Sequence, residues 1–116
     1  MITTPTATAD ILPIKGQGEE ACPKGHFCLY DDVWFNLNQK GGSAIVATAM
    51  SISDLTVLSI GEYVSSFYNR TALTVYICKG FEYVGPCKEI KPNEGVDGGK
   101  HENREWNRTV RSVDIR

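Results

Sequence analysis

Two stretches of this sequence decide its fold, Tyr30-Asp-Asp-Val-Trp-Phe35 and Tyr76-Ile-Cys-Lys-Gly-Phe81. Each contains an aromatic residue, four other residues and a second aromatic residue, and the copies are 46 residues apart (76 − 30 = 46). The agreement around them falls on aromatic and apolar positions at period two, as expected of strand residues that face a core. We therefore predict an internal repeat in which Tyr30 matches Tyr76 and Phe35 matches Phe81.

The same offset extends to the ends of both copies. It places Val64 on Val110, and we expect both valines to be buried because their neighbours alternate outward. The predicted units are two Greek keys, over residues 22–70 and 71–116. Neither unit should be stable alone, because a single sheet leaves one apolar face uncovered.

The remaining patterning is that of an all-β sandwich. Short runs rich in aromatic and β-branched residues, Phe27–Tyr30 and Leu73–Ile77, predict strands, and glycines punctuate the chain at turn-like intervals. A length of 116 residues suits one domain.

Charge and hydropathy exclude two classes of function. Twelve Lys and Arg against fourteen Asp and Glu give a net charge of −2, without the basic surplus of a nucleic-acid binder. No apolar run approaches the roughly 20 residues that a membrane span needs. The N-terminus lacks the features of a signal peptide and suggests the start of a mature chain. The composition of residues 1–21 predicts a flexible arm ahead of a domain over 22–116.

Four cysteines fall into two short-range pairs, Cys22/Cys28 and Cys78/Cys87. An even count in a small chain favours disulfides formed in an oxidising compartment. Of the three connectivities, we expect the two local bridges, each stabilising by about 2–3 kcal/mol. The competing interpretation is a metal site that includes Cys22, His26 and Cys28, but no pair has the spacing of structural zinc ligands.

The paired aromatic stretches resemble the Greek-key motif of the βγ-crystallins. Gly61–Ser66 and Trp106–Ser112 close the two copies where that family has a segment ending in serine. The opening Cys22-Pro-Lys-Gly-His-Phe-Cys28-Leu-Tyr30 resembles the streptomycete metalloprotease inhibitors, which are crystallin-like. That resemblance implies a secreted, single-domain protein with two local bridges. We expect a monomer.

The segment between Cys78 and Cys87 is the predicted contact loop for a protease. A disulfide-closed loop loses less entropy on docking, and its aromatic residues can serve as anchors. The repeat predicts that Phe81 is buried in the corner of the hairpin, which leaves Glu82 and Tyr83 as the better contact candidates. The full candidate set is Lys79, Gly80, Phe81, Glu82, Tyr83 and Val84.

No metal, cofactor or catalytic group is expected. In microbial βγ-crystallins, the segments equivalent to Gly61–Ser66 and Asn107–Ser112 bind calcium. Here Arg111 replaces an oxygen ligand, and we interpret both segments as structural turns in which serine bonds to nearby backbone. His26 and His101 stand in no catalytic motif, so the chain is not expected to be an enzyme.

Three hypotheses follow. The first is a secreted inhibitor of an extracellular metalloprotease that acts through the 78–87 loop. The second is a secreted crystallin-like stress, defence or envelope-binding protein without a protease target, and a weaker third is a calcium-binding crystallin. A loop that protrudes from the body would favour inhibition, and a loop folded flat on the sheet would favour the second hypothesis.

Overall fold

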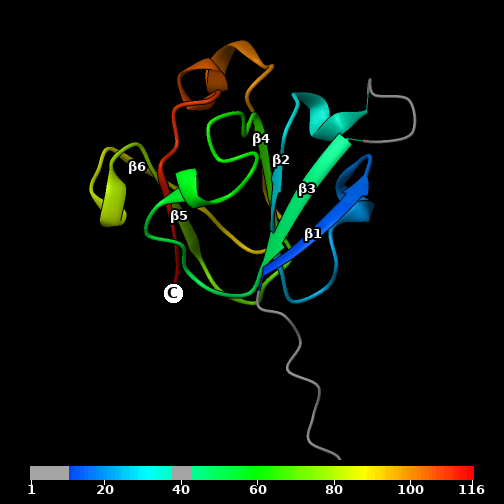
Figure 1. The fold of residues 1–116 in the computed structure, drawn as a ribbon, viewed down its shortest axis with the longest axis horizontal. Coiled ribbons are helices and arrows are strands. Elements are labelled where there is room, and N and C mark those ends of the chain that lie inside the picture. The colour runs from blue at the N-terminus through cyan, green and yellow to red at the C-terminus, as the bar shows by residue number, and fades with distance from the viewer. Residues whose placement is uncertain (1–10, 38–42) are drawn as a thin grey trace, which may run out of the picture.

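The computed structural model describes residues 11–37 and 43–116, which form two packed antiparallel β-sheets (Figure 1). The large sheet has the strand order β1-β3-β2-β4-β7, and the small sheet has the order β6-β5-β8. The strands are β1 (Ile11–Gly16), β2 (Phe27–Tyr30), β3 (Ser43–Thr48), β4 (Ser66–Asn69), β5 (Val75–Cys78), β6 (Cys87–Ile90), β7 (Gly95–Asp97) and β8 (Ser112–Ile115). Short 3-10 helices lie between them: η1 (Glu19–Ala21), η2 (Trp34–Asn36), η3 (Leu55–Val57), η4 (Phe81–Tyr83) and η5 (His101–Trp106). The all-β prediction is confirmed.

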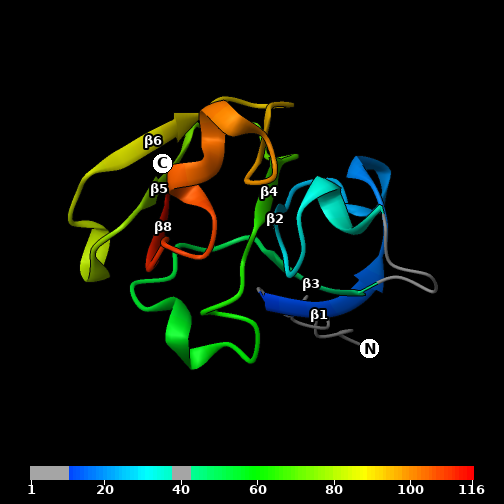
Figure 2. The same ribbon diagram turned by 90° about the horizontal axis from the view of Figure 1, so that it is seen from above.

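Each half of the chain contributes one segment that pairs with a strand in the sheet of the other half. From the second half, β7 pairs with β4 of the first, with Val96 opposite Phe67. From the first half, Ile52 bridges Val113 in β8, through hydrogen bonds of 2.9 Å in both directions. Apart from these exchanges and from β1, which has no counterpart in the small sheet, the strand order is the same in both halves, β3-β2-β4 and β6-β5-β8. The two Greek keys are therefore interlocked, and the view from above shows their sheets on opposite sides of the molecule (Figure 2).

The halves do not match at one constant offset. Ser66 Oγ accepts a hydrogen bond from the Phe35 N–H at 3.1 Å, and Ser112 Oγ accepts one from the Tyr83 N–H at 2.9 Å. Phe35 is thus equivalent to Tyr83, 48 residues away (83 − 35 = 48), while the serines are 46 apart (112 − 66 = 46). The predicted match of Phe35 with Phe81 is wrong, because the chain from this hairpin to the last strand is shorter in the second half.

The predicted match of Tyr30 with Tyr76 fails for the same reason. Tyr30 lies opposite Ser66, whereas Cys78 lies opposite Ser112, so Cys78 occupies the position of Tyr30. Tyr30 is fully buried, and Tyr76 is only partly buried on the outer face of the small sheet. An ungapped comparison rewards identical aromatic residues even where they lie at different positions of a strand.

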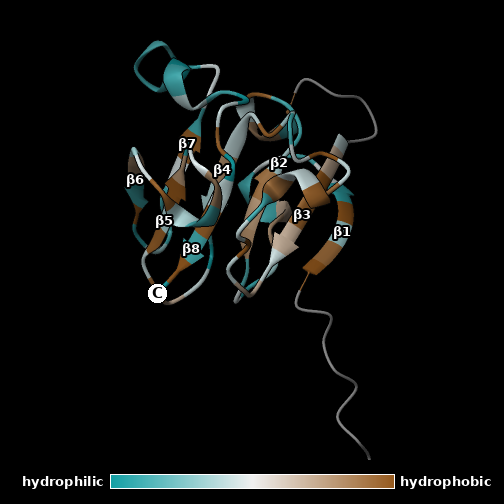
Figure 3. Ribbon diagram, turned by 60° about the vertical axis from the view of Figure 1, so that its left-hand side comes forward, coloured by the Kyte–Doolittle hydropathy of each residue, from teal (hydrophilic) through white to brown (hydrophobic). Residues whose placement is uncertain are grey.

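The main core fills the space between the two sheets. Val64 and Val110 are both 1% exposed, as predicted, and they belong to this cluster. Figure 3 shows hydrophobic residues, in brown, along strands of both sheets. The buried members are Phe27, Leu29, Val46, Ile52, Leu55, Ile60, Val64, Phe67, Val75, Ile77, Ile90, Val96, Trp106, Val110 and Val113.

A second, smaller cluster lies on the outer face of the large sheet. Its buried members are Cys22, Cys28, Tyr30, Ile45 and Ala47. Residues from β1 and from the segment after it complete this cluster, since Leu12, Ile14 and Ala21 pack against it.

The flexible arm predicted for residues 1–21 is therefore wrong from residue 11 onward, while residues 1–10 lie outside the described part. β1 pairs with β3 along its whole length, with Ile14 opposite Ile45. The composition obscured this strand because its exposed positions carry Pro13 and Lys15 and interrupt the apolar residues Ile11, Leu12 and Ile14. These exposed residues suit an edge strand.

Candidate functional site: the 78–87 loop

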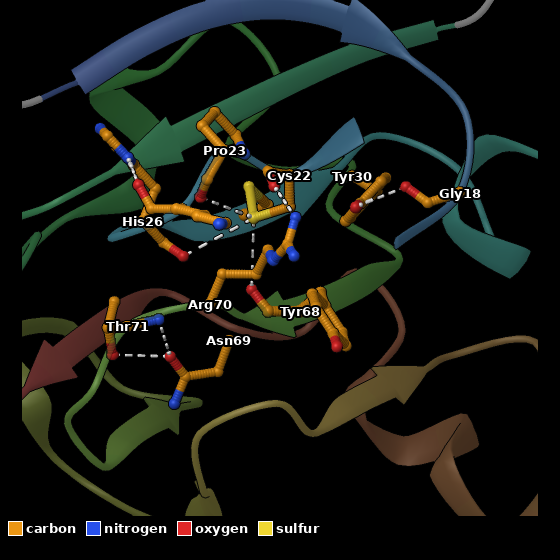
Figure 4. Close-up of a disulfide and its surroundings, with 11 residues drawn as sticks. Gly18, Cys22, Pro23, His26, Tyr30, Tyr68, Asn69, Arg70 and Thr71 are labelled. Carbon is orange, nitrogen blue, oxygen red and sulfur yellow. Dashed lines mark hydrogen bonds between the residues drawn. A yellow bond between two sulfur atoms is a disulfide. The ribbon is translucent and has the colours of Figure 1, made fainter. Parts of the chain in front are cut away.

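Both disulfides form as predicted, Cys22–Cys28 and Cys78–Cys87, with Cα–Cα distances of 5.8 and 4.1 Å. All four cysteines are thus bridged, which rules out the alternative of Cys22 and Cys28 as thiolate ligands of a metal. The first bridge is structural: both its residues are fully buried, and the Arg70 guanidinium donates to the Cys22 carbonyl at 3.0 Å (Figure 4).

The second bridge closes the connection between β5 and β6. Cys78 and Cys87 face each other across this strand pair, and one step further the Lys79 N–H donates to the Pro86 carbonyl at 3.0 Å. The strand pairing therefore continues one residue past the disulfide. Both the disulfide and the Lys79–Pro86 hydrogen bond hold the two ends of the loop together.

Hydrogen bonds inside the loop hold its backbone in one compact turn. The Gly80 N–H donates to the Val84 carbonyl at 2.9 Å, and the Val84 N–H donates to the Phe81 carbonyl at 3.2 Å. A Cβ at Gly80 would lie 2.7 Å from the Val84 oxygen, so this close approach requires glycine.

The tip of the loop has a left-handed backbone at Glu82 (φ 54°) and Tyr83 (φ 65°). Non-glycine residues adopt this conformation only where the surroundings enforce it. Here the Glu82 N–H donates to the Ser53 carbonyl at 2.8 Å, and Ser112 Oγ accepts from the Tyr83 N–H and donates to the Gly80 carbonyl at 2.6 Å. The loop backbone is therefore anchored to the body of the protein at two points.

The anchoring serine was only partly anticipated from the sequence. Ser66 and Ser112 bond to backbone, as predicted, but the carbonyls that they bind belong to the hairpins and not to their own turns. Such contacts join residues about thirty positions apart, so no local motif reveals them. Ser53 was not singled out at all, because it contributes only its carbonyl.

Three apolar side chains of the loop are exposed to solvent. Phe81 is 50% exposed, Tyr83 38% and Val84 62%. The prediction that Phe81 is buried is wrong. It assumed that Phe81 is equivalent to Phe35, whereas the residue at the equivalent position of the second half is Tyr83. The loop has features of both predicted alternatives. Its backbone is held against the body, as in a flat loop, while its apolar side chains face outward, as in a protruding one.

The disulfide explains why Tyr83 is not packed as its equivalent is. In the first half, Phe35 makes an edge-to-face contact with Tyr30, with ring centroids 5.3 Å apart. In the second half Cys78 stands in place of that tyrosine, and Cys87 Sγ lies 3.9 Å from the Tyr83 carbonyl. The bridge thus replaces an aromatic contact and leaves the Tyr83 ring more exposed.

Lys79 has a different environment from the rest of the candidate set. Its ammonium lies 3.3 Å from Glu105 Oε2 and 4.9 Å from the centre of the Trp106 ring. These contacts tie the base of the loop to η5, so the side chains that are available for contact are those of Phe81, Glu82, Tyr83 and Val84.

The predicted structural turns carry arginine cations in the second half. Arg111 Nη1 donates to the carbonyls of Arg108 and Val110 at 3.2 and 3.1 Å. The Arg108 guanidinium lies 5.9 Å from the centre of the Tyr63 ring. Across residues 11–37 and 43–116, no three His, Cys, Asp or Glu residues are grouped as metal ligands.

Solved structures of βγ-crystallin domains share this fold. The chain is similar to a domain from work on the evolution of the eye lens βγ-crystallin fold, with 18% identity, a TM-score of 0.69 and coverage of 91% of this chain and 96% of that chain. A βγ-crystallin from Ciona intestinalis gives 23% identity and a TM-score of 0.59 over 78% of this chain and 99% of that chain. A domain from Clostridium beijerinckii gives 16% and 0.54, over 78% and 95%. The βγ-crystallin-like fold that the motifs predicted is confirmed.

Comparison with curated proteins finds no match. No helix in the described ranges is long and apolar enough to cross a membrane. The model of peptidase inhibitor family I36 matches residues 16–90, which cover more than half of the chain and include both disulfides. That family consists of inhibitors and not of enzymes. The chain belongs to peptidase inhibitor family I36.

Proposed function

We propose that this protein is a secreted inhibitor of an extracellular metallopeptidase and that residues 79–84 form its contact surface. The observation that carries the proposal is a loop whose backbone is closed by a disulfide and anchored at Ser53 and Ser112, and whose apolar side chains are exposed. Secretion is supported by the two disulfides, which persist in oxidising compartments.

The rigid backbone favours binding by reducing its entropic cost. A loop that is already held in one conformation loses little freedom when it docks, so more of the contact energy appears as affinity. Phe81 and Tyr83 are the kind of side chain that dominates interfaces when it enters a pocket of the partner.

The same backbone resists cleavage. A substrate segment lies extended in a peptidase cleft, whereas Glu82 and Tyr83 have a left-handed backbone that five hydrogen bonds around the turn maintain. Extending this tip would break the anchors at Ser53 and Ser112. We therefore expect the loop to block the cleft with its side chains and to remain intact.

The alternative is a crystallin-like secreted protein without a protease target. It is favoured by one observation, the anchoring of the loop backbone against β8 and Ser53. The exposure of Phe81, Tyr83 and Val84 argues for contact with a partner, because three neighbouring apolar side chains on one rigid loop form an apolar patch.

An inhibition panel of secreted metallo-, serine and cysteine peptidases tests the proposal. We expect inhibition of a metallopeptidase by the native protein, and we expect F81A/V84A to weaken it by about 2 kcal/mol, or roughly thirtyfold in the inhibition constant. Val57, which is 73% exposed outside the loop, supplies the matched control V57A. No inhibition of any peptidase, or equal effects of the loop and control variants, would contradict the proposed function.

A further inference from the structure

A groove of about 390 Å³ runs between the outer edges of the two sheets, away from the tip of the 78–87 loop. β6 forms one wall and β7 the other, and η5 contributes at one end; Figure 3 shows the two strands beside each other. Its volume falls at the lower end of the range for ligand sites, about 300–1,000 Å³. The lining residues are Lys88, Glu89, Ile90, Glu94, Gly95, Val96, Glu102 and Asn103.

β6 is an edge strand whose outer backbone is positioned to accept another strand. In an antiparallel ladder, alternate residues direct their N–H and C=O groups toward the partner strand. The Lys79 N–H donates to the Pro86 carbonyl, which shows that the even-numbered residues of β6 are the ones that form hydrogen bonds with β5. The backbone groups of Lys88 and Ile90 therefore face β5. The backbone groups of Cys87 and Glu89 consequently face away from β5, along the free edge.

β7 presents the same feature on the other side of the groove. The Asn69 N–H donates to the Glu94 carbonyl at 2.9 Å, and the Gly98 N–H donates to the Ser65 carbonyl at 2.8 Å. These bonds place the even-numbered residues toward β4 and leave the backbone of Gly95 directed away from it.

The floor and rim of the groove differ in character. Beneath the groove lie Ile90 and Val96, which are 1% and 3% exposed and belong to the main core. Two glutamates, Glu94 and Glu102, and one lysine, Lys88, stand around it, so the rim has a negative balance. The carboxylate of Glu94 accepts from the Lys91 N–H at 2.9 Å, which orients it and leaves further lone pairs available. The carboxylate of Glu89 instead accepts from the Tyr76 hydroxyl at 3.0 Å on the outer face of the small sheet.

We propose that this groove binds an extended peptide segment rich in lysine or arginine, which adds to β6 as a further antiparallel strand. Backbone hydrogen bonds to Cys87 and Glu89 supply the strand pairing, as in other cases of strand addition. Alternate cationic side chains of the segment lie near Glu94 and Glu102, and this charge complementarity selects a basic segment over an acidic one. The site goes beyond the proposed contact loop, and its test requires no peptidase.

NMR titration of the full-length ¹⁵N-labelled protein tests the inference directly. The probe is a blocked hexapeptide of alternating threonine and lysine, titrated to millimolar concentration at low salt. We expect saturable shifts at residues 87–90 and 94–96. The same hexapeptide with glutamate in place of lysine, and the lysine peptide N-methylated at alternate positions, should each fail to bind.

Charge variants identify the site. E94Q/E102Q should raise the dissociation constant of the lysine peptide by about threefold to tenfold. E62Q, at an exposed glutamate outside the groove, should leave it unchanged. The spectra of the free variants show whether each remains folded.

Several outcomes would overturn the inference. They are no shifts at millimolar peptide, equal binding of the glutamate peptide, binding that survives N-methylation, and equal effects of E94Q/E102Q and E62Q. Shifts of the groove residues that depend on protein concentration without peptide would also overturn it, because a second copy would then occupy the edge. None of these results bears on inhibition, so the two proposals fail separately.

Discussion

Ser112 holds the contact loop through one hydroxyl that bonds both Gly80 and Tyr83. Replacing it with alanine leaves a carbonyl and an N–H without their partner, so we expect S112A to lower the free energy of unfolding by about 1–3 kcal/mol. Because the left-handed tip loses an anchor, inhibition should weaken as well. Chemical denaturation and inhibition assays measure the two effects.

Ser66 provides a matched control, since its hydroxyl bonds Phe35 and Asp32 in the same geometry in the first half. S66A should therefore reduce stability by a similar amount and leave inhibition unchanged. If both variants weakened inhibition equally at a temperature where both are folded, the loop would not be the contact surface.

At the level of single residues, the sequence predicted the disulfide pairs and the buried valines correctly, but it did not predict which positions of the two halves are equivalent. The bridges of the four cysteines and the burial of Val64 and Val110 were predicted correctly, because short spacing and alternation are local properties. The equivalence of Tyr30 and Tyr76 was predicted wrongly, because the segment between the hairpin and the last strand is shorter in the second half than in the first. The exposure of Phe81 followed from that same error.

At the scale of elements, the least predictable feature was β1. Its polar and proline positions point to solvent, so its composition is that of a linker although Leu12 and Ile14 pack against the outer cluster of the large sheet. Two of the strands, β2 and β5, were predicted from aromatic and β-branched runs. The groove between β6 and β7 was not predicted, because it depends on how two edge strands from different sheets are placed.

The two disulfides should differ in their reactivity toward thiols. Cys87 is exposed, whereas Cys22 and Cys28 are fully buried. Under native conditions a dithiol reductant should therefore attack Cys87 Sγ, release Cys78 as a thiolate, and then displace the Cys87 thiol as the reductant closes its own disulfide. Alkylation and peptide mapping should show two modified cysteines, Cys78 and Cys87.

The buried bridge supplies the internal control for this reduction. β5 and β6 remain paired through Val75, Ile77 and their partners, so the circular dichroism spectrum should change little while inhibition falls. Earlier modification of Cys22 and Cys28, or unfolding together with the first reduction, would show that the loop bridge supports the whole fold.

For the whole molecule, the two outer sheet faces have different roles. The segment between β1 and β2, with the Cys22–Cys28 bridge, covers the outer face of the large sheet, whereas the small sheet has no such cover among the described residues. Both candidate contact regions, the 79–84 loop and the groove along β6, lie on the hairpin of the small sheet. The first half of the chain thus serves as the scaffold that fixes this hairpin in place.

The exchange of segments between sheets makes the halves interdependent. A fragment over residues 1–70 lacks β7 beside β4, and a fragment over 71–116 lacks Ile52 beside β8. Each fragment also exposes its side of the shared core, in which Val64 and Val110 are buried. We therefore expect neither fragment to give a cooperative thermal transition by circular dichroism. An equimolar mixture should recover the spectrum of the intact chain in proportion to concentration, because β7 again pairs with β4 and Ile52 again bridges β8. A dispersed NMR spectrum from either fragment alone would show that one Greek key is self-sufficient and that the exchange is not what stabilises the domain.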